Sequence, residues 1–189
     1  MRTFEIDRKT KETDVSVKIN LDNPKYKINT GIGFFDHMLT ALSVHSGIGL
    51  EISSIGDLEV DGHHTVEDVG IVLGLALKNA LANKPVARYG FASVPMDESL
   101  ATTTLDISGR AYLVFNAEFE NEKIGDFATE LTEEFFRAFA FNAGITLHIN
   151  LLYGKNDHHK VEAVFKSFAY ALKNAVKESD VLISSKGIL

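Results

Sequence analysis

The sequence of 189 residues contains no cysteine. Without cysteine the chain can form neither disulfide bonds nor thiolate metal sites, so any metal ion must bind through histidine, aspartate and glutamate. The sequence also has no apolar run long enough to cross a bilayer, and its first ten residues, MRTFEIDRKT, lack an apolar signal segment. We therefore expect a cytoplasmic protein without a membrane partner.

Positive charge is scarce as well. The chain has 19 lysines and arginines against 26 aspartates and glutamates, a formal net charge of -7. Proteins that bind nucleic acids usually carry a basic excess, so we expect no nucleic-acid partner. Small anionic substrates stay possible, because a local basic pocket can exist on an acidic protein. The length fits one domain, or two small halves that share one core.

The chain contains an internal repeat. The motif HHTVE at residues 63–67 recurs as HHKVE at residues 158–162, and each copy is followed by ALKNA, all at an offset of 95 residues. Similarity continues upstream of both motifs at an offset of 97 residues. We therefore predict two similar halves, residues 1–90 and 91–189, that form one compact unit.

Each half is expected to contain helices and strands of the same kinds. These elements do not follow a strict βαβ alternation, which favours an α+β fold with layers of sheet and helix. The long helix in each half is apolar around much of its circumference, which predicts burial on two sides, in part against another subunit. Helices are predicted at 34–46, 65–83, 128–143 and 158–178, and strands at 14–21, 48–54, 91–96, 100–107, 111–119 and 144–153.

Four of the seven histidines lie in the two repeated motifs. At the start of a helix, each motif glutamate lies about one turn from both histidines of its motif. Adjacent histidines diverge by about 100° around a helix axis, so each pair suits two different metal ions better than one. A single motif would indicate no more than a solvated helix start, but two copies in register favour a metal site. Imidazole and carboxylate ligands fit Mn, Fe, Co, Ni or Zn.

Two further histidines are candidate ligands. His37 stands at the start of a predicted helix, and His148 interrupts an apolar strand, with its side chain on the face opposite Leu147. Each half then supplies three histidines and one glutamate, enough for two metal ions with about four protein ligands each. His45 is left over, and we interpret it as a structural or surface histidine.

The two motifs are each preceded by an aspartate. Asp61 stands two residues before His63, and Asp157 stands directly before His158. A ligand imidazole usually donates its second ring N–H to a carboxylate or carbonyl. We therefore expect Asp61 and Asp157 to orient the ligand histidines.

Several polar residues could bind an anion such as phosphate. Hydroxyl groups, backbone N–H groups and cations together suit phosphate, although the C-terminal members also fit an ordinary frayed tail. Lys166 lies one turn past Glu162, near the expected metal face, and could equally be a solvated lysine. The other candidates are Arg88, Arg110, Ser184, Ser185 and Lys186.

Over nearly its whole length the sequence resembles the imidazoleglycerol-phosphate dehydratase family. The resemblance rests on long, ordered motifs: KETDVSVKINL, TGIGFFDHML, GD, DGHHTVEDVGIVLG, RYG, PMDESLA, DISGR, TLHI, GKNDHHKVEAVFKSFAYAL and SSKGIL. It implies two α+β halves of the ribosomal protein S5 domain 2-like type. It also implies a hydro-lyase of histidine biosynthesis that removes water from D-erythro-imidazole glycerol phosphate to give imidazole acetol phosphate. Members form a 24-mer, with two Mn²⁺ ions in each active site between subunits.

The resemblance also implies roles for individual residues. The implied metal ligands are His37, His63, His64, Glu67, His148, His158, His159 and Glu162. The implied substrate contacts are Glu12, Arg88, Arg110, Lys166, Ser184, Ser185 and Lys186. Glu12, Glu67 and Glu162 form the implied catalytic set, although Glu12 alone would be read as a solvated charge. One departure is Glu134, where many members have histidine; this position lies outside the implied ligand set.

The resemblance gives the doubled motif a chemical reason. The proton to be lost is not next to a carbonyl, so the substrate's own imidazole must supply the stabilisation, and two metal ions suit its two nitrogens. Two other classes of protein remain as alternatives. A metal-storage scaffold explains the histidine motifs but not Arg88 and Arg110. A di-metal hydrolase explains both, but such sites usually depend on bridging carboxylates.

Overall fold

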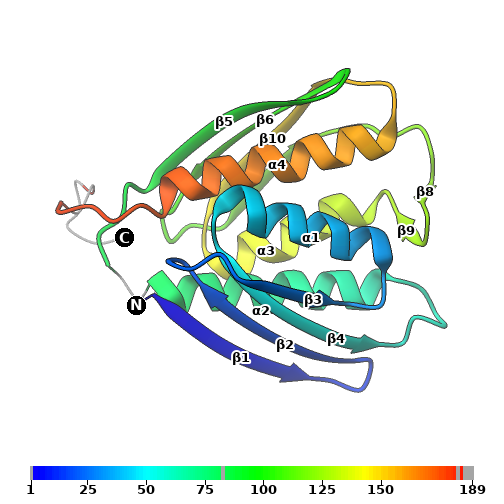
Figure 1. Cartoon of the computed structure of the whole chain (residues 1–189), viewed down its shortest axis with the longest axis horizontal. Coiled ribbons are helices and arrows are strands. Elements are labelled where there is room, and N and C mark those ends of the chain that lie inside the picture. Colours follow the sequence, from blue (N-terminus) through cyan, green and yellow to red (C-terminus); the bar gives the residue numbers. More distant parts are fainter. Residues whose placement is uncertain (1, 82–83, 182–183, 185–189) are drawn as a thin grey trace.

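The computed structural model describes residues 2–81, 84–181 and 184 (Figure 1). Strands and helices alternate irregularly along the chain. The first half contains β1 (Thr3–Lys9), β2 (Thr13–Asn20), β3 (Tyr26–Asn29), α1 (Gly33–Ser46), β4 (Gly49–Gly56) and α2 (His63–Leu81). The second half contains β5 (Tyr89–Met96), β6 (Ser99–Asp106), β7 (Tyr112–Asn116), β8 (Lys123–Ile124), β9 (Phe127–Ala128), α3 (Leu131–Ala143), β10 (Thr146–Tyr153) and α4 (Asp157–Ala175).

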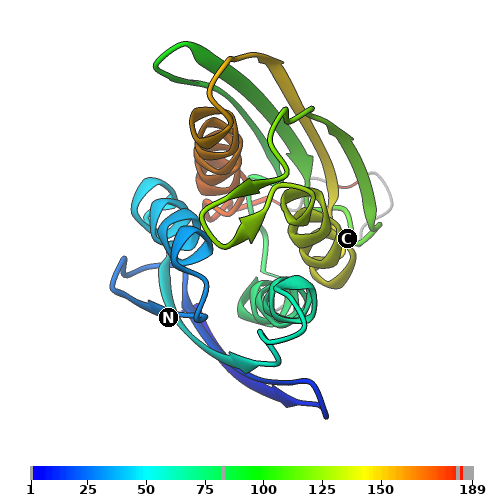
Figure 2. The same ribbon diagram turned by 90° about the vertical axis from the view of Figure 1, so that its right-hand side faces the viewer.

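The two halves fold alike. The strand order is β1-β2-β4-β3 in one sheet and β5-β6-β10-β7 in the other. In both sheets the first three strands are antiparallel neighbours, and the fourth runs parallel to the strand beside it. Figure 2 shows the helices between the two sheets. The predicted α+β fold with two similar units of sheet and helix is therefore confirmed.

Two helix pairs join the halves, α1 with α4 and α2 with α3. The second pair is especially close because α2 has glycines at the contact. A methyl group added to Gly70 would lie 2.9 Å from Ala138 Cβ, and one added to Gly74 would lie 2.6 Å from the Phe139 carbonyl oxygen. Each pair therefore brings residues from one half directly against the other.

Phenylalanine side chains fill the centre of the core. Phe135, Phe136 and Phe139 of α3 and Phe165 and Phe168 of α4 are fully buried, and the rings of Phe136 and Phe165 lie 4.9 Å apart between centroids. Large aromatic side chains contribute much of the apolar area that a core of this size buries. The long helices are also buried on two sides as predicted, since α2 packs on β2 and α3, and α4 packs on β5, β6 and α1.

Several elements differ from the sequence prediction. The strands β1, β3, β8 and β9 were not predicted. The edge strand β1 is half exposed, and only two of its seven residues, Phe4 and Ile6, are apolar, so its alternating pattern is short. Helix α3 begins at Leu131 instead of residue 128, because Phe127 and Ala128 pair with β8. Within the described ranges, no helix is long and apolar enough to cross a membrane.

Candidate metal centre

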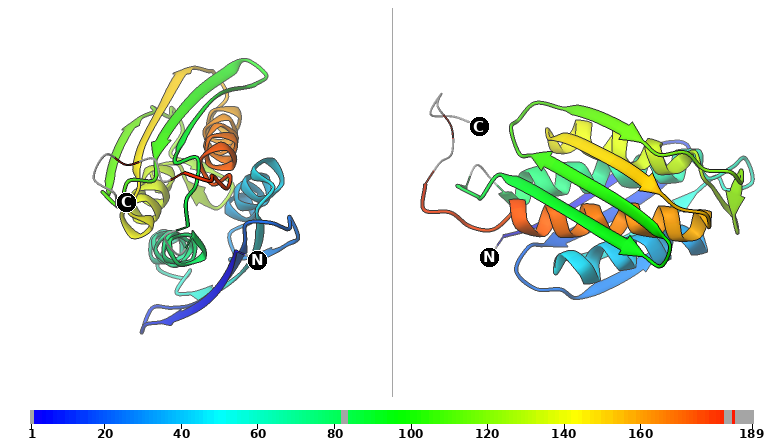
Figure 3. Two further views of the ribbon diagram at one scale, coloured as in Figure 1. Left: turned by 90° about the vertical axis from the view of Figure 1, so that its left-hand side faces the viewer. Right: turned by 90° about the horizontal axis from the view of Figure 1, so that it is seen from above.

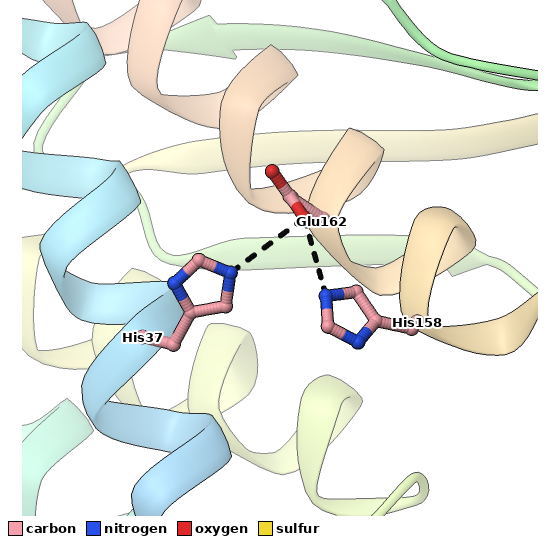
Figure 4. Close-up of side chains that lie close together, drawn as sticks. All are labelled: His37, His158 and Glu162. Atoms are coloured by element: carbon pink, nitrogen blue, oxygen red, sulfur yellow. Dashed lines mark ion pairs between the residues drawn. The ribbon is translucent and has the colours of Figure 1, made fainter.

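Three side chains from α1 and α4 form what we call the first cluster: His37, His158 and Glu162. Their candidate ligand atoms all lie within 4.8 Å of one another. Glu162 Oε2 is 3.7 Å from His37 Nε2 and 3.3 Å from His158 Nε2 (Figure 4). The start of α4 is fixed by Asn156, whose side-chain oxygen accepts the backbone N–H of His158. The packing of α1 on α4 and the capping of α4 by Asn156 therefore bring these three donor side chains together.

Glu162 of the first cluster is buried and charged. Burial tends to raise the pKa of its carboxyl group, but Lys166 more than offsets this with an ion pair of 2.6 Å between Nζ and Oε1, so the pKa is lowered overall. A charged carboxylate beside two imidazole nitrogens is a donor set that suits a divalent ion. Lys166 therefore lies one turn from Glu162, directly beside the first cluster.

The second cluster consists of His63 and Glu67 of α2 with Glu134 of α3, and its ligand atoms also lie within 4.8 Å of one another. It occupies the place in the repeat that matches the first cluster, with Glu134 at the position of His37. Sequence reasoning left Glu134 out of the ligand set because its residue type differs. The offset of 97 residues that aligns it with His37 was the signal that could have found it.

The remaining two motif histidines, His64 and His159, are held by carboxylates from outside the helices. His64 Nδ1 lies 3.0 Å from Asp57 Oδ2, and His159 Nδ1 lies 2.7 Å from Glu98 Oε2. These hydrogen bonds raise the pKa of both imidazoles. With Nδ1 occupied, Nε2 of each ring is the atom that can bind a metal ion.

The prediction that Asp61 and Asp157 orient the imidazoles is wrong. Asp61 accepts the backbone N–H of His63 and so caps α2. Asp157 is buried and accepts hydrogen bonds from the backbone N–H groups of Glu120 and Asn121. Burial raises its pKa, but its ion pair with Lys160 and these hydrogen bonds lower it to about 2. Both aspartates therefore fix local backbone, and the orienting carboxylates come from elsewhere.

Replacing Glu98 with glutamine should weaken metal binding. The amide cannot accept the imidazole N–H with a full negative charge, so His159 would lose orientation and basicity, and we expect a loss of metal affinity of about 10- to 100-fold. Titration of the metal-free protein with Mn²⁺ would measure this, with Glu51→Gln on the exposed face of β4 as the control. Equal affinities for wild type and Glu98→Gln would remove Glu98 from this role.

Glu12 lies at the same end of the molecule as the motif histidines. Its carboxylate is more than half exposed, with Oε2 at 4.0 Å from His64 Nε2. Its backbone oxygen accepts the N–H of Asp57. Glu12 immediately precedes β2 as Glu98 immediately precedes β6, so the two residues occupy equivalent turns in the two halves.

An open cavity borders the second cluster. It has a volume of about 590 Å³, and His63, Asp61, Lys123 and Asp126 are among the residues that line it. This is ample room for a small polar molecule. A ligand bound in this cavity would lie beside the His63 imidazole of the second cluster and the Lys123 side chain.

Arg88 and Arg110 lie at the opposite end of the molecule from both clusters. Arg88 binds Asp106 with two nitrogens, Nε at 2.6 Å and Nη2 at 3.1 Å, and Arg110 Nη2 is 3.9 Å from the same carboxylate. The backbone N–H of Arg88 donates to the carbonyl of Ala175 at the end of α4, whereas His158 stands at its start (Figures 1 and 3). The separation is 175 − 158 = 17 residues, or about 26 Å of helix.

The remaining predicted contacts lie near the C-terminus. Ser185 and Lys186 are outside the described residues. Ser184 is described and is partly buried, beyond the end of α4. Arg88 has a positive φ of 72°, a conformation that is costly for a residue with a side chain and is more frequent at functional sites. Among the candidate anion-binding residues, Arg88 therefore has the backbone conformation that is typical of a functional site.

His148 joins neither cluster. It lies on the exposed face of β10 between the buried Leu147 and Ile149, as the alternation predicted. Its assignment as a ligand stays a prediction. His45, interpreted as structural, lies with Nδ1 3.3 Å from the Tyr170 hydroxyl, between α1 and α4.

Comparison with known proteins agrees with these features. Residues 30–172 match the sequence model of the family described as imidazoleglycerol-phosphate dehydratase. The protein of that name from Clostridium acetobutylicum is 58% identical, over 98% of this chain and 97% of the relative. The one from Acetivibrio thermocellus is 55% identical, over 100% of this chain and 99% of the relative. The crystal structure of the Staphylococcus aureus protein superposes with a TM-score of 0.86, 45% identity and coverage of 94% and 99%. The crystal structure of the Pyrococcus furiosus protein in complex with (S)-C348 superposes with a TM-score of 0.86. Its sequence is 40% identical, and the match covers 97% of this chain and 100% of that protein.

Proposed function

Because this chain belongs to the imidazoleglycerol-phosphate dehydratase family, and so is a hydro-lyase of histidine biosynthesis, we propose that it acts with two Mn²⁺ ions in each active site. The reaction converts D-erythro-imidazole glycerol phosphate into imidazole acetol phosphate and water. The observation that carries the proposal is the pair of clusters. Each offers imidazole nitrogen and carboxylate oxygen within 4.8 Å, a set that fits manganese and has no softer thiolate to favour other ions.

The ions would be held by residues from both halves of the chain. His37, His158 and Glu162 would hold one ion, and His63, Glu67 and Glu134 the other. His64 and His159 have Nδ1 engaged and Nε2 available, so they would complete the coordination of ions held largely by neighbouring subunits. Bound there, the two ions would polarise the substrate imidazole and lower the pKa of its N–H.

Glu12 is the proposed acid/base. Loss of water needs a group that removes the C–H proton and a proton for the departing hydroxide. A carboxylate that is more than half exposed and lies 4.0 Å from His64 Nε2 can reach a substrate bound at this histidine. Glu67 and Glu162 contribute to catalysis by holding the ions in place.

The cations are proposed to bind the substrate phosphate. Arg88 and Arg110 are held by Asp106 at one end of the molecule, and Ser184, Ser185 and Lys186 would add hydroxyl groups and a charge. Lys166 would act beside the first cluster. Since about 26 Å of helix separates Arg88 from the first cluster, the Arg88 and Arg110 that serve one site would come from another subunit. This supports a homo-oligomer, which we propose is a cytoplasmic 24-mer.

Metal removal tests the proposal. Dialysis against a chelator should abolish formation of imidazole acetol phosphate, followed by NMR, and Mn²⁺ should restore it. Release of inorganic phosphate instead would indicate a hydrolase. Light scattering on the same samples would show whether assembly depends on the metal. Full activity in the chelated protein would contradict the metal dependence, and unchanged size would argue against ligands shared between subunits.

A further inference from the structure

The two clusters come from equivalent positions but differ in charge. In the first cluster α1 contributes His37, whereas in the second cluster α3 contributes Glu134. The second cluster therefore has two carboxylates beside one imidazole. Like charges at such separations repel, and the repulsion is largest where burial reduces the screening by water.

Arg137 forms ion pairs with both of these carboxylates. It contacts Glu134 with two nitrogens, Nε at 3.1 Å from Oε2 and Nη2 on Oε1, and Nη2 also lies 3.3 Å from Glu67 Oε1. The equivalent position in α1, 97 residues earlier, is Thr40. The pair Glu134 and Arg137 thus stands where the first half has a histidine and a threonine.

The helices that carry the two carboxylates pack closely against each other. Gly70 and Gly74 hold α2 against α3 at a separation that leaves no space for even a methyl group. Glu67 lies three and seven residues before these glycines, on the same side of α2. The backbone thus keeps the two acidic positions as neighbours, where a nearby cationic side chain can offset their charge.

We infer that Arg137 is the counter-ion that offsets the added negative charge of Glu134 in the second cluster. The two residues act as one unit at the positions that His37 and Thr40 occupy in the first half. The inference rests on the proposed metal function. Arg137 offsets one of the two carboxylate charges of the second cluster. In the first cluster the single carboxylate, Glu162, is likewise paired with a cation, Lys166. Arg137 is a positioning residue, since it acts on the metal site through Glu67 and Glu134.

A double-mutant cycle tests the unit. Arg137→Thr leaves two unbalanced carboxylates and should tighten Mn²⁺ binding at one of the two equivalents by about tenfold, as one unit charge near a partly exposed site predicts. Glu134→His leaves Arg137 without its fork partner and should weaken the same equivalent by about tenfold or more. The double variant copies the first half and should return close to the wild-type affinity.

The measurement is titration of metal-free protein with Mn²⁺, with free Mn²⁺ read by electron paramagnetic resonance. Arg137→Lys keeps the charge without the fork and should stay within about threefold of wild type, while Lys78→Thr on the exposed side of α2 should change neither equivalent. Weaker binding in Arg137→Thr, or no recovery in the double variant, would overturn the inference. If wild type binds two equivalents but the cycle fails, only this inference falls; if wild type binds none, the proposed function falls with it.

Discussion

Two inactive variants of this enzyme should regain activity when their subunits are assembled together. Arg88→Ala removes the candidate phosphate contact, and His158→Ala removes a ligand of the first cluster. In one chain these residues stand at opposite ends of α4. If one subunit supplies the metal end of a site and another its anion end, some mixed sites contain neither defect.

The expected recovery can be calculated. In an equal mixture that assembles at random, a site formed by two subunits has both ends intact in about one case in four, so activity should return to roughly a quarter of wild type. The matched control mixes His158→Ala with His37→Ala, which damage the same cluster and should not complement. Activity after unfolding and joint refolding gives the answer. Complete inactivity of the Arg88→Ala and His158→Ala mixture would indicate that each site lies within one chain.

Glu12→Gln should lower kcat by about a thousandfold while substrate still binds. The amide has the shape of the carboxylate but cannot take up the proton that the elimination releases. Because the Glu12 side chain is more than half exposed, the substitution should leave the fold intact. The measurement is kcat with Mn²⁺ present, together with calorimetric binding of substrate to the inactive variant.

Glu5→Gln, on the exposed side of β1, provides the matched control and should retain wild-type kcat. A Glu12→Gln variant with kcat within a few-fold of wild type would show that another group moves the proton. A variant that loses both binding and turnover would instead make Glu12 a binding residue.

The clusters were predictable from sequence where the repeat and the residue type agreed. Two copies of His-His-x-x-Glu in register predicted the helix starts that carry His63, Glu67, His158 and Glu162, and the structure brings these residues into two groups. Glu134 escaped because the position matched but the residue type did not. Periodicity describes one element at a time, whereas a ligand set is chosen by which helices pack together.

The carboxylates that orient the His64 and His159 imidazoles could not be predicted from the sequence, for a related reason. Asp57 follows β4, and Glu98 stands in the turn between β5 and β6, 61 residues before its partner His159. Nothing in local spacing connects such pairs, although both lie in motifs that the family resemblance had singled out. The aspartates that were chosen, Asp61 and Asp157, were nearest in sequence, but at a helix start a nearby carboxylate is drawn to the free backbone N–H groups.

The equivalent turns that carry Glu12 and Glu98 show how duplication can divide one task into two. Glu98 accepts the backbone N–H groups of Lys155 and Asn156 and the imidazole of His159, and these interactions keep its pKa well below the usual range. Its carboxyl group therefore favours the ionised form, in which it accepts these hydrogen bonds. Glu12 kept its exposure to solvent. The two equivalent turns therefore carry one carboxylate that is held by the fold and one that is open to solvent, the one we propose as the acid/base.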